Sequence, residues 1–294
     1  MKWFKRLLLT LAIVAVLVIL LTALGYRRLH GVPDWYTVRT FSAEQLQKLE
    51  QAAENKFINA QNWAAEHRAI ESANRKQGTT QSSTEPTAAT KPADTTTIEL
   101  TEEEVNALFQ KWLARSGYVD KLKKYLVDPV LVIRDGRVIV AGTLAEMNTL
   151  ASVHFEPKVT AEGNLDLRLV KVLGGKLPLP KAVWSSQREK IIQAVAKHMP
   201  GWARAASIDD SGIANTDAIN VALTRMLVHV LNDEPSEPVI FLPVIQRGAV
   251  PARLTDVAVE DETLSLTVTP MTPAEREAFL AKLKGTAPKV IAAR

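Results

Sequence analysis

The sequence predicts an α+β protein with an N-terminal transmembrane helix, a long stalk helix, and then a curved antiparallel sheet packed with helices. Three observations predict this fold class. An uncharged apolar run occupies Leu7–Gly25. Apolar residues then recur at three- and four-residue steps over 43–76, which is typical of a helix. From Pro129 onward they alternate with a period of two, which is typical of strands.

The Leu7–Gly25 run has the length of a membrane-spanning helix. At about 1.5 Å per residue it covers roughly 29 Å, close to the ~30 Å hydrocarbon core of a bilayer. The flanking residues are basic or aromatic: Lys2, Trp3, Lys5, Arg6, Tyr26, Arg27 and Arg28. A cleavable signal peptide is the alternative, with Ala23-Leu24-Gly25 as its cleavage site. Because the run is longer than a usual signal core, we expect residues 1–28 to remain as an anchor.

The basic residues around this run favour an N-terminus in the cytoplasm. We therefore expect a single-pass protein of the bacterial inner membrane, with its main domain in the periplasm or otherwise outside the cytoplasm. The net charge of +4 reflects the anchor, because residues 1–28 hold five basic and no acidic side chains. The remaining chain has 31 basic against 32 acidic side chains, which argues against nucleic acid as a partner. The absence of cysteine excludes disulfides, iron–sulfur clusters and thiolate zinc sites.

Residues 29–76 form the predicted stalk. Ser42 and Gln45 have the spacing of a capping box, and a helix follows from Ala43 to Lys76. Its apolar stripe is rich in alanine, so we expect it to pack on its own domain rather than in a coiled coil. His67 on that stripe is interpreted as a half-buried spacer. Trp35 and Tyr36, ahead of the helix, are expected either at the membrane interface or under the domain.

Residues 77–97 are rich in Thr, Ser and Pro, and we expect a disordered linker there. The extracytoplasmic domain is predicted over 98–294, with a sub-boundary near residue 200. It opens with a second capping box, from Thr101 to Glu104. The acidic triplet Glu102–Glu104 is interpreted as favourable charge at a helix start rather than as a metal site.

An antiparallel meander of about four strands follows. Asp135-Gly136 joins Val130–Arg134 to Arg137–Gly142 and predicts a type I′ hairpin. The next strands are expected at about 151–160 and 164–172. We interpret His154, with its neighbours Glu156 and Lys158, as part of a solvated strand face.

The second half of the domain is predicted to alternate helices and strands. Helices are expected at 182–198, 218–231 and 273–284, a buried strand at 239–244, and a hairpin of 253–260 with 263–269. Leu177-Pro178-Leu179-Pro180 forms an apolar loop, because its prolines exclude a central strand. Thr272, Pro273 and Glu275 are typical of a helix start.

Several short motifs over residues 98–190 resemble the YpmS-like bacterial envelope proteins. The matching residues are Leu100–Leu108, the strand containing Gly142, Phe155-Glu156-Pro157, Glu162-Gly163-Asn164-Leu165, and Leu177-Pro178-Leu179-Pro180 before a helix. That family begins with one transmembrane helix and looks related to tubular lipid-binding domains. The resemblance implies lipid handling or upkeep of the cell envelope. The stalk, the Thr-rich linker and the segment after residue 200 depart from the family pattern.

The predicted function is binding of lipid or another apolar ligand, without catalysis. The five histidines are far apart, and no His-x-x-x-His pair, Gly-x-Ser-x-Gly elbow or phosphate loop is present. No cofactor or metal is expected. The predicted partners are membrane lipid and an envelope protein, and the alternative function is a scaffold that uses the stalk for protein contacts. The predicted ligand-binding residues are Leu177, Leu179, Val183, Trp184, Met199 and Trp202.

Overall fold

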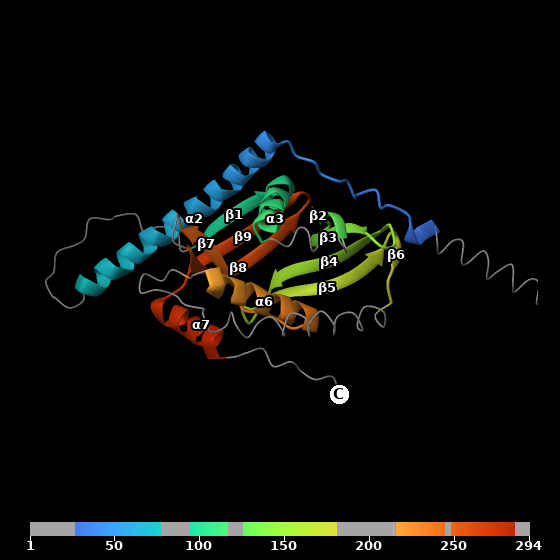
Figure 1. Cartoon of the computed structure of the whole chain (residues 1–294). Coiled ribbons are helices and arrows are strands. Elements are labelled where there is room, and N and C mark those ends of the chain that lie inside the picture. The colour runs from blue at the N-terminus through green and yellow to red at the C-terminus, as the bar shows by residue number, and fades with distance from the viewer. Residues whose placement is uncertain are drawn as a thin grey trace, which may run out of the picture.

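The computed structural model describes residues 27–77, 95–116, 126–180, 214, 216–244 and 248–285. The described residues form two antiparallel sheets and four helices (Figure 1). The anchor run, most of the linker and the predicted helix at 182–198 lie outside the described residues. Within the described ranges, none of the helices combines the length and the apolar character needed to cross a bilayer.

The first sheet has four strands in the order β1 (Thr96–Thr101), β9 (Thr263–Pro270), β8 (Gly248–Glu260) and β7 (Val239–Val244). The second has five, in the order β2 (Leu126–Arg134), β3 (Arg137–Leu144), β4 (Thr149–Val159), β5 (Leu165–Gly174) and β6 (Leu177–Pro178). The helices are α2 (Ala43–Gln77), α3 (Glu102–Ser116), α6 (Thr216–Asn232) and α7 (Pro273–Gly285).

The mixed α+β class is confirmed, but the predicted single curved sheet is replaced by two sheets. The sequence interpretation missed β1, which begins at Thr96 inside the predicted linker. Thr96 pairs with Val268, and Thr101 pairs with Thr263. Strand β1 thus gains its stability from β9, which lies more than 160 residues further along the chain.

The predicted helix starts and hairpins are present. The Ser42 hydroxyl accepts a hydrogen bond from the Gln45 amide (3.2 Å), while the Gln45 side chain accepts one from the Ser42 amide (3.0 Å). Thr101 with Glu104 and Thr272 with Glu275 make the same reciprocal pairs. Asp135 and Gly136 have φ of 52° and 70°, as a type I′ turn requires.

Helix α2 packs against its own domain, as predicted, and not as a free stalk. Its alanine stripe, Ala53, Ala60 and Ala64, is buried against the four-stranded sheet. The core there consists of Ile98, Leu100, Leu242, Ala252, Leu254 and Val268. Small side chains let a helix approach a sheet closely, so the alanine stripe contributes to the main core.

The polar face of β4 is buried at Ser152 and His154, which contradicts the interpretation of His154 as part of a solvated face, whereas Glu156 is only half-buried. Ser152 is 1% and His154 is 2% exposed, although Lys158 at the end of the strand is exposed. Trp35 meets the His154 ring edge to face, with centroids 5.7 Å apart, and packs with Tyr36 on Val130, Val132 and Ile139. The segment after residue 30 therefore covers this face, and of the two expected positions the aromatic pair takes the one under the domain.

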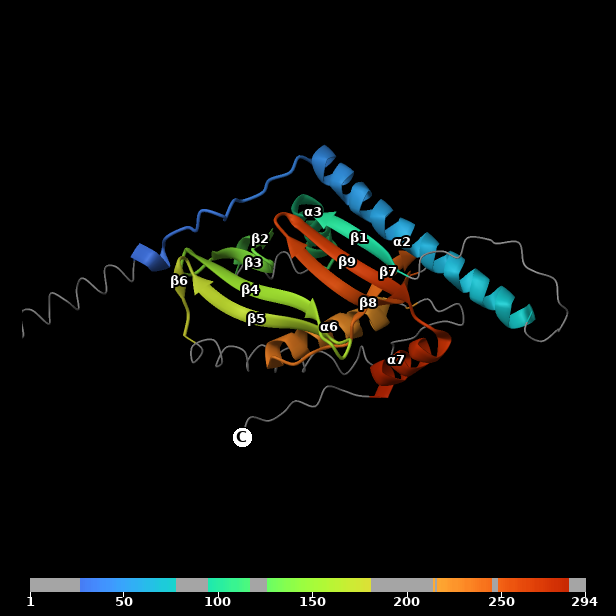
Figure 2. The ribbon, with the colours of Figure 1, turned by 180° about the vertical axis from the view of Figure 1, so that it is seen from behind.

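The two sheets lie side by side and meet where β8 and β9 approach β2 and β4 (Figures 1 and 2). Two hairpin turns join them. The Glu262 amide donates to the Ile133 carbonyl (2.9 Å), and the Asp135 amide donates to a carboxylate oxygen of Asp261 (3.2 Å). Helix α2 lies on one side of the four-stranded sheet, and α6 and α7 lie on the other.

Candidate functional site

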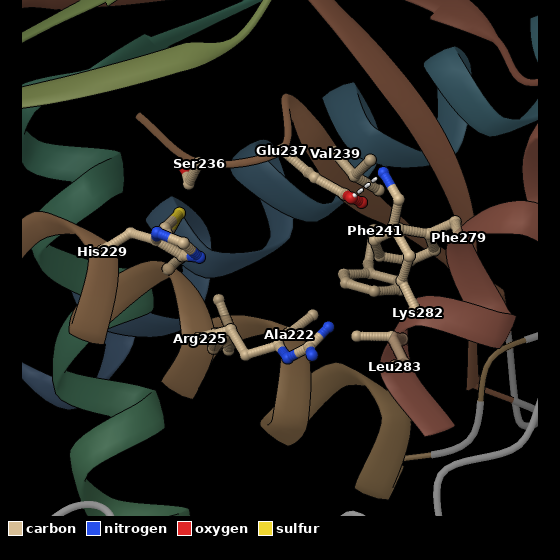
Figure 3. Close-up of a pocket in the computed structure, with 12 residues that line it drawn as sticks. Ala222, Arg225, His229, Ser236, Glu237, Val239, Phe241, Phe279, Lys282 and Leu283 are labelled. Atoms are coloured by element: carbon tan, nitrogen blue, oxygen red, sulfur yellow. Dashed lines mark hydrogen bonds and ion pairs between the residues drawn. The ribbon is translucent and has the colours of Figure 1, made fainter. Parts of the chain in front are cut away.

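A pocket of about 240 Å³ lies between α6, α7 and β7 (Figure 3). Helix α6 supplies one wall because its apolar residues recur at helical spacing, and some of them face α7 rather than the sheets. Helix α7 begins at the Thr272–Glu275 capping box, which fixes where its inner face meets α6. The volume is just below the range of about 300 to 1,000 Å³ that is usual for small-molecule sites.

The floor of the pocket is apolar. Phe241 from β7 and Phe279 from α7 have ring centroids 6.2 Å apart at an angle of 48°. Phe279 and Leu283 are buried with Ala218 and Val221 in a cluster of their own. The other apolar lining residues are Ala222, Leu223, Met226 and Val239. An apolar floor of this kind binds the hydrocarbon part of a ligand.

Two cationic side chains lie at the sides of this floor. The Arg225 side chain lies at the pocket in the close-up, across from α7 (Figure 3). Burial lowers the pKa of the Arg225 guanidinium from its ordinary value, and the Glu237 carboxylate partly offsets this effect. An arginine nevertheless stays protonated at neutral pH. A partly buried cation beside apolar surface favours an anionic group, because its own charge is incompletely hydrated.

Lys282 is the second cation, and it belongs to an ion pair at the rim. Its ammonium lies 2.6 Å from a carboxylate oxygen of Glu237, which links α7 to the chain just before β7 (Figure 3). The Lys282 side chain is 65% exposed, so this pair contributes at most about 1 kcal/mol to stability. A ligand carboxylate or phosphate could compete with Glu237 for Lys282 at little cost.

His229 and Ser236 line the opposite side of the pocket. His229 Nδ1 lies 3.3 Å from a carboxylate oxygen of Glu234, close enough for charge attraction but without hydrogen-bond geometry. The Ser236 hydroxyl donates to the Leu165 carbonyl at the start of β5 (3.3 Å). That bond commits the serine proton to the backbone and fixes the pocket wall to the five-stranded sheet.

Two of the six predicted ligand-binding residues lie in the described part of the chain. Leu177 and Leu179 are half-buried at β6, where the Leu179 amide donates to the Val172 carbonyl (2.9 Å). They do not line the pocket. Val183, Trp184, Met199 and Trp202 lie outside the described residues.

Sequence reasoning missed the pocket because its lining resembles ordinary core. Leu223 and Met226 have the spacing of a buried helix face, yet Leu223 is 44% exposed at the pocket. His229, further along the same helix, also lines the pocket. The available signal was Arg225, a cation on the predicted helix between apolar positions, which is unusual for a fully buried face.

The acidic triplet at the start of α3 serves the fold. Glu104 accepts hydrogen bonds from the Thr101 amide (2.8 Å) and from Lys56 (2.7 Å), which agrees with its interpretation as a helix-start feature. Across the described ranges, no group of three or more His, Cys, Asp or Glu side chains is arranged to hold a metal ion.

Comparisons of the chain with protein-family models, with curated proteins and with solved structures gave no significant match.

Proposed function

We propose that this protein is a membrane-anchored binding protein, and that the pocket between α6, α7 and β7 holds an amphiphile with an apolar body and an anionic group. The observation that carries the proposal is the pairing of an apolar floor, built on Phe241 and Phe279, with the cations Arg225 and Lys282 at its sides. An anionic lipid or a fatty acid has both chemical features. The pocket volume suits part of such a molecule, so the rest of the ligand would extend beyond the rim.

The anchor part of the proposal depends on the Leu7–Gly25 run and its basic flanks. A tethered domain meets membrane lipid at a high local concentration, so a shallow site can be occupied without tight binding. The main domain would lie outside the cytoplasm. Alkaline extraction of membranes tests the anchor: the intact chain should stay in the membrane pellet, and its mass should include residues 1–28. A shortened, soluble chain would contradict the anchor.

Ligand binding is tested on the full chain purified in a mild detergent. Mass spectrometry should detect a lipid or fatty acid that copurifies with the protein, and a fluorescent fatty acid should bind with saturation. If neither is seen, the binding proposal is wrong.

Arg225→Gln provides the residue-level test. The substitution keeps much of the side-chain bulk but removes the cation, so we expect affinity for the fluorescent fatty acid to fall about tenfold, as loss of a charge-assisted contact predicts. Binding of the matched fatty alcohol, which has no charge, should change little. Arg134→Gln is the control. This substitution lowers the net charge by the same amount, but Arg134 lies in the β2–β3 hairpin and does not line the pocket. Equal losses in both variants would mean that Arg225 does not contact the ligand.

A further inference from the structure

The segment that follows the proposed anchor is fastened to one end of the five-stranded sheet. The described chain begins with a helical turn at residues 27–29, and this turn lies beside β6 in both views (Figures 1 and 2). Two turns of the sheet lie at this end: residues 145–148 between β3 and β4, and residues 175–176 between β5 and β6. Together with residues 27–34, we call them the sheet tip.

The β5–β6 turn is in direct backbone contact with residues 28 and 29. The Lys176 amide donates to the Arg28 carbonyl (2.8 Å). Gly175, with φ of 57°, leaves no space for a side chain, because a Cβ there would lie 2.0 Å from the Leu29 carbonyl oxygen. The Lys176 ammonium also binds the Asp34 carboxylate (3.1 Å). Glycine is required at position 175 both by the close approach of the Leu29 carbonyl oxygen and by the positive φ.

The β3–β4 turn is tied to the same segment. The Thr149 hydroxyl lies 3.2 Å from His30 Nδ1 and 3.1 Å from the Met147 carbonyl oxygen. The Gly175 amide donates to the Leu150 carbonyl (2.6 Å), so the two turns are also joined to each other. These contacts make residues 28–34 part of the folded domain rather than a flexible tether.

The length of chain between anchor and contact limits where the domain can sit. Arg28 follows Gly25 by three positions in the chain, and three residue steps span at most about 11 Å. The headgroup layer on each side of a bilayer is roughly 5 to 7 Å thick. If Leu7–Gly25 spans the membrane, the first fixed point of the domain therefore lies within or just above the headgroups.

We propose that the sheet tip docks on the outer surface of the bilayer and holds the domain in one orientation, a proposal that rests on the proposed anchor. Val32 and Met147 are each 56% exposed there, and large apolar side chains of this kind partition into the membrane interface. The sheet tip carries three basic side chains, Arg27, Arg28 and Lys176, against two acidic ones, Asp34 and Glu146. Its net positive charge attracts anionic lipid.

The natural absence of cysteine allows a direct test with single labels on the full chain. Met147→Cys places an environment-sensitive fluorophore at the tip, and Ala161→Cys places it in the exposed turn at the other end of β4. The 11 residues of β4 separate the two sites by roughly 36 Å. Each variant is reconstituted in vesicles of phosphatidylethanolamine and phosphatidylglycerol that contain a lipid-bound quencher.

We expect the lipid quencher to reduce the Met147→Cys fluorescence at least about twofold more than the Ala161→Cys fluorescence, because the quencher acts only at membrane depth. Iodide, a quencher dissolved in the water, should instead reduce the Ala161→Cys fluorescence more than the Met147→Cys fluorescence. Equal quenching at both sites would overturn the docking proposal, even where the chain still floats with the vesicles. Failure to float would instead overturn the anchor, and docking with it.

A glycine pair tests the contact itself. Gly175→Ala should detach residues 28 and 29 from the turn and lower the lipid quenching at Met147→Cys toward the Ala161→Cys level, with flotation unchanged. Gly163→Ala is the control, since Gly163 has a φ of 77° but open space around its missing Cβ. A cooperative urea transition shows that each variant is folded. Unchanged quenching in folded Gly175→Ala would overturn the role assigned to this contact.

Discussion

At the residue scale, the imidazole of His154 makes stability depend on pH. Burial lowers the pKa of His154 to about 4, and the nearby charges of Lys171 and Arg137 act in the same direction. The unfolded chain has an ordinary histidine pKa of about 6.5, so it binds more protons than the folded protein between pH 6.5 and 4. Stability therefore falls as the pH falls through that window and levels off below the folded-state pKa.

We expect this one group to remove about 2 kcal/mol of unfolding free energy between pH 7 and pH 4.5. His154→Gln should lose that part of the pH dependence, as measured by urea unfolding of the full chain in detergent at several pH values. A wild-type slope in His154→Gln would show that the buried imidazole is not the group that titrates.

The alternating pattern of β4 could not reveal this burial. Ser152 and His154 stand on the polar side of the strand, and such residues usually face water. The His154 ring is buried where Trp35, more than 115 residues earlier, packs against it. Strand alternation specifies that the two faces differ, but the partner that covers the polar face comes from another part of the chain.

At the element scale, Glu102 joins three segments that are distant in sequence. One of its carboxylate oxygens binds Arg39 (2.5 Å) ahead of α2, and the other accepts the Ile133 amide of β2 (2.6 Å). The Glu102 amide, at the start of α3, donates to the Glu262 carbonyl in the β8–β9 turn (2.7 Å). A buried carboxylate with two partners is costly to alter, because each partner is then left without its acceptor.

We expect Glu102→Gln to lower the unfolding free energy by about 2 kcal/mol, since one of the two acceptor oxygens becomes an amide NH2 group, which cannot accept a hydrogen bond from Arg39 or Ile133. Glu103→Gln is a close control. Glu103 is 55% exposed and also contacts Arg39 (3.3 Å), so its loss should cost less than about 0.5 kcal/mol. Denaturant unfolding of the two variants measures the difference. Equal losses of unfolding free energy would mean that the negative charge at the helix start stabilises the fold and that the specific contacts of Glu102 do not.

The elements that depend on local signals could be predicted from the sequence. The capping boxes at Ser42 and Thr101 and the Asp135-Gly136 turn involve contacts over three or four residues, and each is present. Strand β1 depends on β9 instead, so its Thr-rich start resembled the linker. The pocket was missed for a similar reason, because two helices and a strand from separate parts of the chain have to meet before its cations and aromatic rings adjoin.

At the scale of the whole molecule, the sequence suggested a stalk at 29–76 and a separate domain at 98–294. The structure puts the alanine stripe of α2 in the core of the four-stranded sheet, with Ala53 fully buried. The apolar face of α2 from Ala53 to Ala64 is thus occupied by the protein itself, which leaves this stretch unavailable to the scaffold partner considered from the sequence. Residues 27–77 then contribute to the fold at both ends, through α2 and through the sheet tip.

A fragment of residues 98–294 should therefore fail to fold cooperatively, whereas residues 27–294 should unfold in a single transition. Without α2, the sheet would expose Leu100, Leu254 and Val268, and it would also lose the Thr96 and Thr97 pairs with β9. A fragment of residues 95–294 separates the loss of these strand pairs from the loss of residues 27–77, because it keeps all of β1 but lacks both α2 and the segment before it. We expect it to resemble the shorter fragment, with strong binding of a hydrophobic dye and no sharp urea transition, since burial of the sheet face contributes far more than two strand pairs. If 95–294 instead unfolded sharply at the same urea concentration as 27–294, residues 27–77 would contribute little to the stability of the two sheets.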